Sequence, residues 1–374
     1  MVRMKYKKGL SSNVIFLPYD KIEDSKRLSS FEIIMKYRNF NLLDTFSKGN
    51  LVGVKLYFGE DCDCNFIDPE FVSSTINMLR QRSVDPILCD TTNKYNNRFD
   101  NIYKHINTIR DNTDFTYDCS NVPFVMLDGV NGYSEVVRNT TQTTNYSEMA
   151  TLSDHDQVYL AGELENMKGL IIFSRLTPHH RSGMQGAINN IGFGLASRKG
   201  KVRQHSVSKP QVDLDKCVLC GKCIYVCPVK AISIINKRIV IDGNKCIDCG
   251  KCVEYAYRGD ISYQWNATQE HCQRTMASHA LGVANMFSSK IIYCNFLTNF
   301  SNPNEKKGDT MNIGILFSKD PVAIDHASIE LIKAYDKRLL PQMASRDVDY
   351  NIQLEYGEMI GLGTRQYKLT TIAY

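Results

Sequence analysis

A block of seven cysteines constrains this chain more than any other feature of its sequence. The spacing C-x2-C-x2-C occurs within residues 216–223 and again, 29 residues later, within residues 245–252. The first copy continues to Cys227 and Pro228, which completes C-x2-C-x2-C-x3-C-P, the bacterial ferredoxin signature for a cubane iron-sulfur cluster. Three thiolates on one tight loop can wrap one face of such a cluster, so its fourth ligand must come from elsewhere. The spacing therefore predicts a 4Fe-4S cluster as cofactor.

Two ligand sets follow from the rule that, in two-cluster ferredoxins, the fourth cysteine of each motif binds the other motif's cluster. The complete set is Cys227, Cys246, Cys249 and Cys252. The incomplete set is Cys217, Cys220 and Cys223, because Ala256 stands where the second motif would have its fourth cysteine. The incomplete set could hold a 3Fe-4S cluster, or a 4Fe-4S cluster with a non-cysteine ligand such as water or Asp260. Another cysteine, such as Cys272, could also be the fourth ligand of that cluster, or the site could be empty.

Other metal sites fit this pattern less well, because structural zinc takes four ligands that usually come as two separated pairs. The chain has thirteen cysteines and no apolar stretch after its basic N-terminus, so we expect a reducing, cytoplasmic location. Of the remaining cysteines, Cys89 and Cys294 lie in apolar runs and are interpreted as core residues. Cys62 and Cys64 lie in an acidic loop, where either a metal or redox role or simple solvation is possible.

Composition excludes some partners. The net charge is only +5, too balanced for a nucleic-acid-binding face, and no apolar run approaches the roughly 18 residues of a membrane span. We therefore expect neither nucleic acid nor membrane as a partner. A redox partner protein or a small-molecule substrate is expected instead.

The rest of the chain predicts an α/β fold, a mostly parallel sheet with flanking helices. Short apolar runs at residues 14–19, 51–58, 85–90, 122–128, 169–175, 290–297 and 313–318 are typical of strands buried on both faces. Helices are predicted near residues 98–110 and 271–286, and after the Asp-Pro pairs at Asp68 and Asp320. Because strands occur on both sides of the cysteines, we divide the chain into a first α/β part (1–208), a small α+β ferredoxin-like insert (209–262) and a second α/β part (263–374).

Several further motifs together carry a family resemblance over roughly residues 50–335. They are the runs at residues 54–60, 90–95, 128–129, 183–206 and 319–325, together with Arg98 and His105. With these motifs the chain resembles the domain-of-unknown-function family 362, iron-sulfur proteins with an embedded ferredoxin segment. The resemblance implies cluster binding and an α/β scaffold, and it implies no substrate. The chain departs from the family pattern at Ala256, at Asn189 where a lysine is common, and in a loop at residues 302–309 that lacks the cysteines often found there.

Polar residues outside the cysteines are candidates for a substrate site. The glycine-rich run 183–200 does not match a nucleotide-binding motif, so it is interpreted as a set of tight turns, with glycines where the backbone needs positive φ or close contact. Beside them, Asn190, Ser197, Arg198 and His205 could donate hydrogen bonds to a cluster, or Arg198 could bind an anionic substrate. His180 follows the end of a strand. The candidate catalytic residues are His180, Arg198 and His205. Lys55 and Glu60 are interpreted as a solvated charge pair, and Asp320 and Asp325 as structural residues.

Three functions remain open at this point. The first is a ferredoxin-like electron-transfer protein with at least one 4Fe-4S cluster. The second is an oxidoreductase acting on a small molecule in the α/β part, with the cluster as electron relay. The third is a protein in which the cluster is purely structural.

Overall fold

A single twisted sheet forms the centre of the protein. In the computed structural model, the residues described are 11–37, 42–56, 67–92, 102–112, 122–140, 157–264, 266–301, 310–336 and 348–372. Eight strands of these residues pair in the order β18-β1-β17-β14-β7-β2-β3-β4. They are β1 (Ser12–Pro18), β2 (Leu51–Lys55), β3 (Asp85–Asp90), β4 (Phe124–Met126), β7 (Gly169–Arg175), β14 (Ile291–Leu297), β17 (Gly314–Ser318) and β18 (Tyr367–Thr371).

The sheet is mostly parallel, as predicted. All its neighbouring pairs are parallel except the two that involve β17, which runs antiparallel to both β1 and β14. Strands from before the cysteines (β7) and after them (β14) pair side by side, with Ile171 opposite Ile292. The α/β fold class is thereby confirmed.

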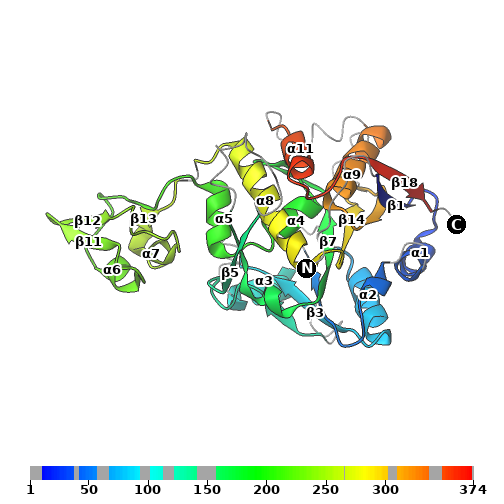
Figure 1. Cartoon of the computed structure of the whole chain (residues 1–374), viewed down its shortest axis with the longest axis horizontal. Helices are drawn as coiled ribbons and strands as arrows, with labels where there is room; N and C mark the ends of the chain where they lie inside the picture. Colours follow the sequence, from blue (N-terminus) through cyan, green and yellow to red (C-terminus); the bar gives the residue numbers. More distant parts are fainter. Residues whose placement is uncertain are drawn as a thin grey trace.

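Helices cover both faces of this sheet, as Figure 1 shows. The helices of the α/β part are α1 (Asp24–Lys36), α2 (Pro69–Gln81), α3 (Ile102–Asn112), α4 (Ala187–Gly192), α5 (Arg198–His205), α8 (Gln269–Phe287), α9 (Pro321–Tyr335) and α11 (Asn351–Met359). Smaller elements are η1 (Leu43–Thr45), β5 (Glu135–Asn139), β6 (Gln157–Ala161), η4 (Gly162–Asn166), β8 (Thr177–His179), β9 (Gly183–Gln185), β15 (Phe300–Ser301) and β16 (Thr310–Met311).

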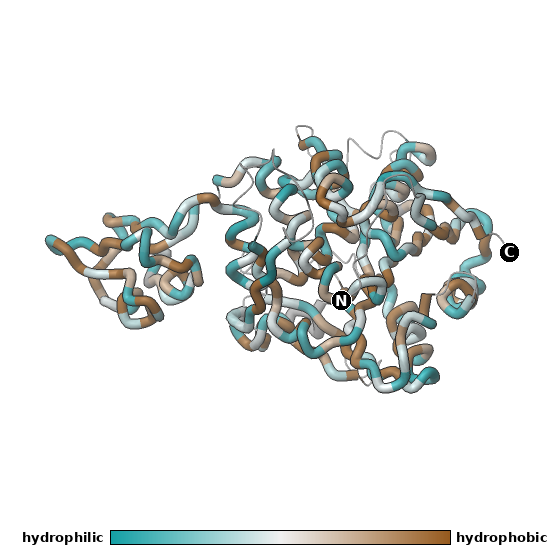
Figure 2. Tube along the Cα trace, in the orientation of Figure 1, coloured by the Kyte–Doolittle hydropathy of each residue, from teal (hydrophilic) through white to brown (hydrophobic). Residues whose placement is uncertain are grey.

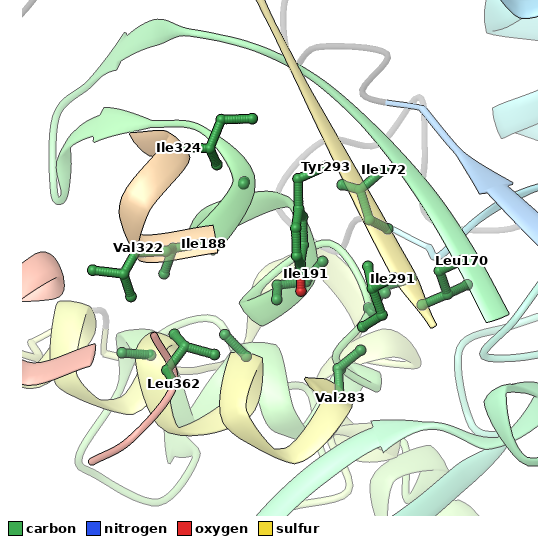
Figure 3. Close-up of a cluster of buried hydrophobic side chains, with 14 of the residues drawn as sticks. Leu170, Ile172, Ile188, Ile191, Val283, Ile291, Tyr293, Val322, Ile324 and Leu362 are labelled. Atoms are coloured by element: carbon green, nitrogen blue, oxygen red, sulfur yellow. The ribbon is translucent and has the colours of Figure 1, made fainter. Parts of the chain in front are cut away.

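Alternate residues of each central strand enter two different cores. On β7, Leu170 and Ile172 pack with α4, α8 and α9, whereas Ile171 and Phe173 pack with α1 and α2. Figure 3 shows the first of these cores, where Ile172 and Ile291 of the sheet face Ile188 of α4 and Val283 of α8. This alternation is the period of a pleated strand, and burial on both faces explains why the strands read as continuous apolar runs.

Two predicted helix starts are confirmed by their caps. Asp68 accepts a hydrogen bond from Glu70 N at the start of α2, and Asp320 accepts from Val322 N and Ala323 N at the start of α9. Asp325 is structural as well, because its carboxylate accepts from Ala187 N at 2.7 Å, at the start of α4. Proline at the first helical position needs no hydrogen bond there, so Asp-Pro begins each helix at little cost.

The glycine-rich run brings helices close together. A Cβ on Gly192 would lie 2.3 Å from Met276 O of α8, and one on Gly200 would lie 2.3 Å from Tyr159 O of β6. These two positions have no room for a side chain, so the expectation that glycine permits close backbone contact in this run is confirmed for them.

Residues 209–264 form a small unit that projects beside α5, with few neighbours in the rest of the protein (Figure 1). Its elements are β10 (Gln211–Val212), α6 (Lys222–Val226), β11 (Ile232–Ile235), β12 (Arg238–Ile241), α7 (Lys251–Glu254), η5 (Tyr257–Gly259) and β13 (Ile261–Ser262). We call it the cysteine segment. Its two ends are held together at its base, where Ser206 Oγ donates to Gln264 O at 2.7 Å and Ala267 N donates to His205 O at 3.2 Å.

Candidate cluster-binding site and its link to the sheet

The two cysteine motifs have the same backbone conformation. Gly221 and Gly250 precede α6 and α7 with φ of 73° and 74°, and Leu219 and Asp248 both have φ of 56°. Left-handed conformations are costly for residues other than glycine, so their repetition indicates one loop design used twice. Each loop leads into a short helix that carries the third cysteine of its motif inward, where Cys223 and Cys252 are buried.

The complete set lines one pocket. Cys227, Cys246, Cys249 and Cys252 surround it together with apolar side chains that include Ile232 and Ile241. Cys227 comes from the first motif and the other three from the second, so the chain brings together the four cysteines that the crossed rule joins. Ala231 N lies 3.2 Å from Cys227 Sγ and can donate to it, the kind of contact that stabilises charge on a cluster ligand.

The chemistry of this pocket fits a 4Fe-4S cluster. Four thiols around an apolar hollow are the donor set for a cubane, in which each sulfur binds a different iron. Burial raises the pKa of the Cys246 thiol, so iron would have to displace its proton. Among the described residues, no group of three or more His, Cys, Asp or Glu side chains could hold a metal ion as the side chains stand.

The incomplete set lies around the other half of the same small core. Cys223 is buried, Cys217 is half-buried and Cys220 is exposed. Ala256 packs against the core that contains Cys223 and Ile261. A methyl group thus stands in the place where the repeat would put a fourth thiolate.

A buried arginine joins the cysteine segment to the α/β part. Arg198 Nη1 of α5 lies 3.0 Å from Glu254 Oε2 of α7, two residues after Cys252, and its side chain is 3% exposed. Tyr133 completes the junction, because its hydroxyl donates to the Glu254 carboxylate and its ring lies under the guanidinium at 5.1 Å. Burial and the neighbouring carboxylate raise the pKa of Tyr133, so the phenol stays protonated as the donor.

A group of buried charges lies at the carboxyl ends of β2, β3 and β4. Lys55 Nζ is 2.8 Å from Asp90 Oδ1, and His105 Nε2 is 3.3 Å from Asp90 Oδ2. Burial alone would raise the pKa of Asp90, but the Lys55 ammonium and the His105 hydrogen bond hold it well below its usual range. The interpretation of Lys55 as a solvated charge is therefore wrong, since its side chain is 1% exposed. Its supposed partner Glu60 lies outside the described residues.

Lys201 of α5 extends the same group. Its ammonium donates to Thr91 Oγ1 at 2.7 Å and to Thr92 O, and Thr92 N donates to the Asp128 carboxylate at 2.9 Å. Burial lowers the pKa of Lys201 to about 8, although Asp128 and Asp90 oppose the shift. Burial raises the pKa of Asp128, which the charge of Lys201 partly offsets. A lysine and a carboxyl whose pKa values move toward neutrality are suited to proton transfer.

The three candidate catalytic residues do not lie together. Arg198 and His205 stand at opposite ends of α5, a rise of about 10 Å. His205 is buried beside Cys272, with Nδ1 3.1 Å from Sγ, and burial lowers its pKa to about 3. His180 is exposed and its ring lies 4.8 Å from that of His179.

Cys272 belongs to α8 of the α/β part, and burial raises its pKa to about 12. The thiol and the His205 imidazole are therefore both neutral at physiological pH, unlike an activated thiolate pair. Cys89 and Cys294 are fully buried core residues, as predicted. Cys62 and Cys64 lie outside the described residues, as does the loop at residues 302–309.

Sequence reasoning missed Lys201 and Asp90 as site residues. Lys201 follows Arg198 by three positions, which places both on one side of a helix, and this spacing was the signal available. Asp90 ends a predicted strand and sits where ligands commonly bind in open α/β sheets.

Comparison with known proteins gives the family. Residues 52–330 match the family described as Domain of unknown function (DUF362). The chain belongs to this family. A comparison with curated proteins gave no match.

Two solved structures are similar to this chain. One is the lactate racemase apoprotein from Thermoanaerobacterium thermosaccharolyticum, with 12% identity and a TM-score of 0.38, covering 80% of this chain and 53% of that one. The other is a protein from Thermotoga maritima, with 9% identity and a TM-score of 0.42, covering 91% of this chain and 60% of that one. The chain thus spans between half and two thirds of the length of these two proteins.

The DUF362 match includes the buried charges from Lys55 to Lys201 and the whole cysteine segment. Asn189 is buried and its amide lies 3.3 Å from Met276 Sδ. Among the described residues, no helix combines the length and apolar character needed to cross a membrane.

Proposed function

We propose that this DUF362 protein binds an iron-sulfur cluster and transfers electrons. The observation that carries the proposal is the apolar pocket lined by the complete set, Cys227, Cys246, Cys249 and Cys252. When bound there, a 4Fe-4S cluster supplies one-electron chemistry at a potential set by its protein surroundings. The chain's own part is to hold the four thiolates, to exclude water with Ile232 and Ile241, and to donate Ala231 N–H toward Cys227.

The surface of the cysteine segment favours exchange of electrons with a protein partner. Several large apolar side chains of the cysteine segment are exposed, and Figure 2 colours parts of this projecting unit brown, for hydrophobic residues. They include Val218, Tyr225, Ile234, Ile235 and Tyr255. Exposed apolar groups gathered on one small unit are typical of an interaction surface. One electron would enter from a reduced donor and leave to an oxidised acceptor, with no atom transferred.

The test is anaerobic reconstitution with iron and sulfide, followed by iron analysis and low-temperature EPR before and after dithionite. We expect a four-iron signal that appears on reduction. Cys249→Ser should remove or strongly alter this signal, whereas Cys272→Ser, which changes a cysteine of the α/β part, should leave it unchanged. Absence of iron in the unaltered protein, or equal effects of the two substitutions, would contradict the proposal. A cluster that cannot be reduced reversibly would favour the purely structural role.

A second function, a small-molecule oxidoreductase, is supported by a different observation. Arg198 joins the cluster-bearing α7 to α5, and one turn further on Lys201 reaches the buried charges at the strand ends. This path connects the cluster pocket with two proton-transfer candidates, Lys201 and Asp128. Lys201→Met with intact cluster content is the test. Loss of a substrate-dependent electron transfer with unchanged EPR would support the enzyme, and unchanged transfer would leave the carrier.

A further inference from the structure

The fourth-cysteine positions of the two motifs differ in a compensating way. Cys227 is followed four residues later by Ala231, and the equivalent positions 29 residues on are Ala256 and Asp260. The first half thus has a cysteine and then an alanine, while the second has an alanine and then an aspartate. Compared with the first motif, the second therefore lacks a sulfur at its fourth-cysteine position and has a carboxylate four residues later.

Backbone hydrogen bonds show that these positions are spatially equivalent. Asp242 N donates to Ala231 O at 2.8 Å, and Asp213 N donates to Asp260 O at the same distance. The next link is repeated too, because Cys246 N donates to Asp242 O at 2.9 Å and Cys217 N to Asp213 O at 3.1 Å. Backbone hydrogen bonds therefore connect Asp260, through Asp213, to Cys217, the first cysteine of the incomplete set. In the same way they connect Ala231, through Asp242, to Cys246, the first cysteine of the second motif.

This equivalence tells where the Asp260 side chain lies. Ala231 lines the pocket of the complete set, beside Cys227. By the repeat, Asp260 occupies the same place over Cys217, Cys220 and Cys223.

One oxygen of the buried Asp260 carboxylate also lacks a hydrogen-bond partner among the described residues. The residue is 5% exposed, and within the described part of the chain its buried Oδ1 has no hydrogen-bond partner. Leaving a buried carboxylate oxygen unpaired costs free energy, and coordination to a cation would remove that cost. The two residues before it, Arg258 and Gly259, have φ of 64° and 69°, so the chain turns sharply just before Asp260.

We propose that Asp260 is the fourth protein ligand of a second 4Fe-4S cluster, which it holds together with Cys217, Cys220 and Cys223. The proposal rests on the proposed function, because it requires that the cysteine segment binds iron. Carboxylate oxygen is a harder donor than thiolate, so the iron bound to Asp260 is held less tightly than the other three. Cys272 does not serve this purpose, since its thiol lies in α8 beside His205.

The experiment compares reconstituted variants by iron analysis and EPR. Unaltered protein is expected to hold about eight irons, two four-iron clusters. Asp260→Ala should hold about seven and, after oxidation, show the signal of a three-iron cluster. Asp215→Ala changes an exposed aspartate of the same segment and serves as the matched control, expected to keep eight. In the double variant Ala256→Cys with Asp260→Ala, a thiolate at the usual position should restore the eighth iron.

Each outcome decides the matter. Loss of one to four irons in Asp260→Ala, with recovery in the double variant, supports ligation by Asp260. If Asp260→Ala does not fold, Asp260→Asn carries the test, because it keeps the shape of the side chain and removes the carboxylate, and the same loss of iron there supports the proposal. An unchanged spectrum in Asp260→Ala, or a three-iron signal already present in freshly reconstituted unaltered protein, overturns it. Unaltered protein with about four irons overturns it while leaving the first cluster intact, whereas protein without iron refutes the proposed function itself.

Discussion

The ion pair between Lys55 and Asp90 gives the sharpest quantitative prediction. The two charged atoms are 2.8 Å apart between β2 and β3, and the Lys55 side chain is 1% exposed. At an effective dielectric constant of 20, unit charges at this distance attract by about 6 kcal/mol before desolvation is subtracted. Removing one partner of a buried pair typically costs about 3–5 kcal/mol, because the other charge stays buried without compensation.

Asp90→Asn is the informative change. The asparagine oxygen can still accept from Lys55 and from Thr91 N, which now donates to Asp90 at 2.8 Å, so shape is kept and charge is lost. We expect the free energy of unfolding to fall by about 3 kcal/mol, the lower end of that range. Lys55→Met should cost a similar amount, because it leaves the carboxylate with Thr91 and His105 alone.

The double variant with both changes tests the reasoning. With neither charge buried, its loss should be clearly smaller than the sum of the two single losses, giving a coupling energy of about 2 kcal/mol or more. Urea denaturation followed by far-ultraviolet circular dichroism measures all three, with the linear slope compared between variants. Single losses below about 1 kcal/mol, or losses that simply add, would refute the idea that this pair is a compensated buried charge.

Three further predictions concern the α/β part. Gly192→Ala should lower the free energy of unfolding by about 2 kcal/mol or more, because its Cβ would lie 2.3 Å from Met276 O. The control Gly243→Ala has open space around the new methyl group and should be near neutral in the same urea assay. Asp320→Ala removes the cap of α9 and should cost about 1–2 kcal/mol, whereas an unchanged denaturation midpoint would contradict that role. His205 has a folded pKa of about 3, below the unfolded value of about 6.5, so it favours the folded state least at low pH. Stability should fall as pH drops from 6.5 toward 3, and His205→Gln should flatten that slope in a pH series of melting temperatures.

Local signals made much of the fold predictable. Residues 85–90 and 169–175 were expected as strands, and β3 and β7 have those bounds, because each is an apolar run ending in a charged residue. The Asp-Pro pairs fixed the starts of α2 and α9 through capping chemistry. By contrast, α1 and β18 carry weak patterns of their own, and β18 is placed by pairing with β1 from the opposite end of the chain.

The candidate sites also differ in whether a local sequence pattern or the packing of distant segments forms them. The complete set was predictable because cluster chemistry imposes a spacing that can be read within one short stretch. The buried charges were not, because Lys55, Asp90 and Lys201 come from three separate segments, and each alone reads as an ordinary surface residue. Only the order of strands in the sheet brings them together. The contact between Cys272 and His205 was not predicted either. His205 comes before the cysteine segment and Cys272 after it, so no local pattern relates the two residues.

The closed base of the cysteine segment has a consequence for how such a protein can change. His205 and Ala267 lie within one hydrogen bond of each other, so the whole segment leaves and re-enters the α/β part at nearly one point. Removing it would leave a gap that a short turn could bridge, and inserting a different unit there would disturb no strand of the sheet. The arrangement therefore separates the evolution of the cysteine segment from that of its scaffold, and the contact of Glu254 with Arg198 and Tyr133 is one through which a change in either part would affect the other.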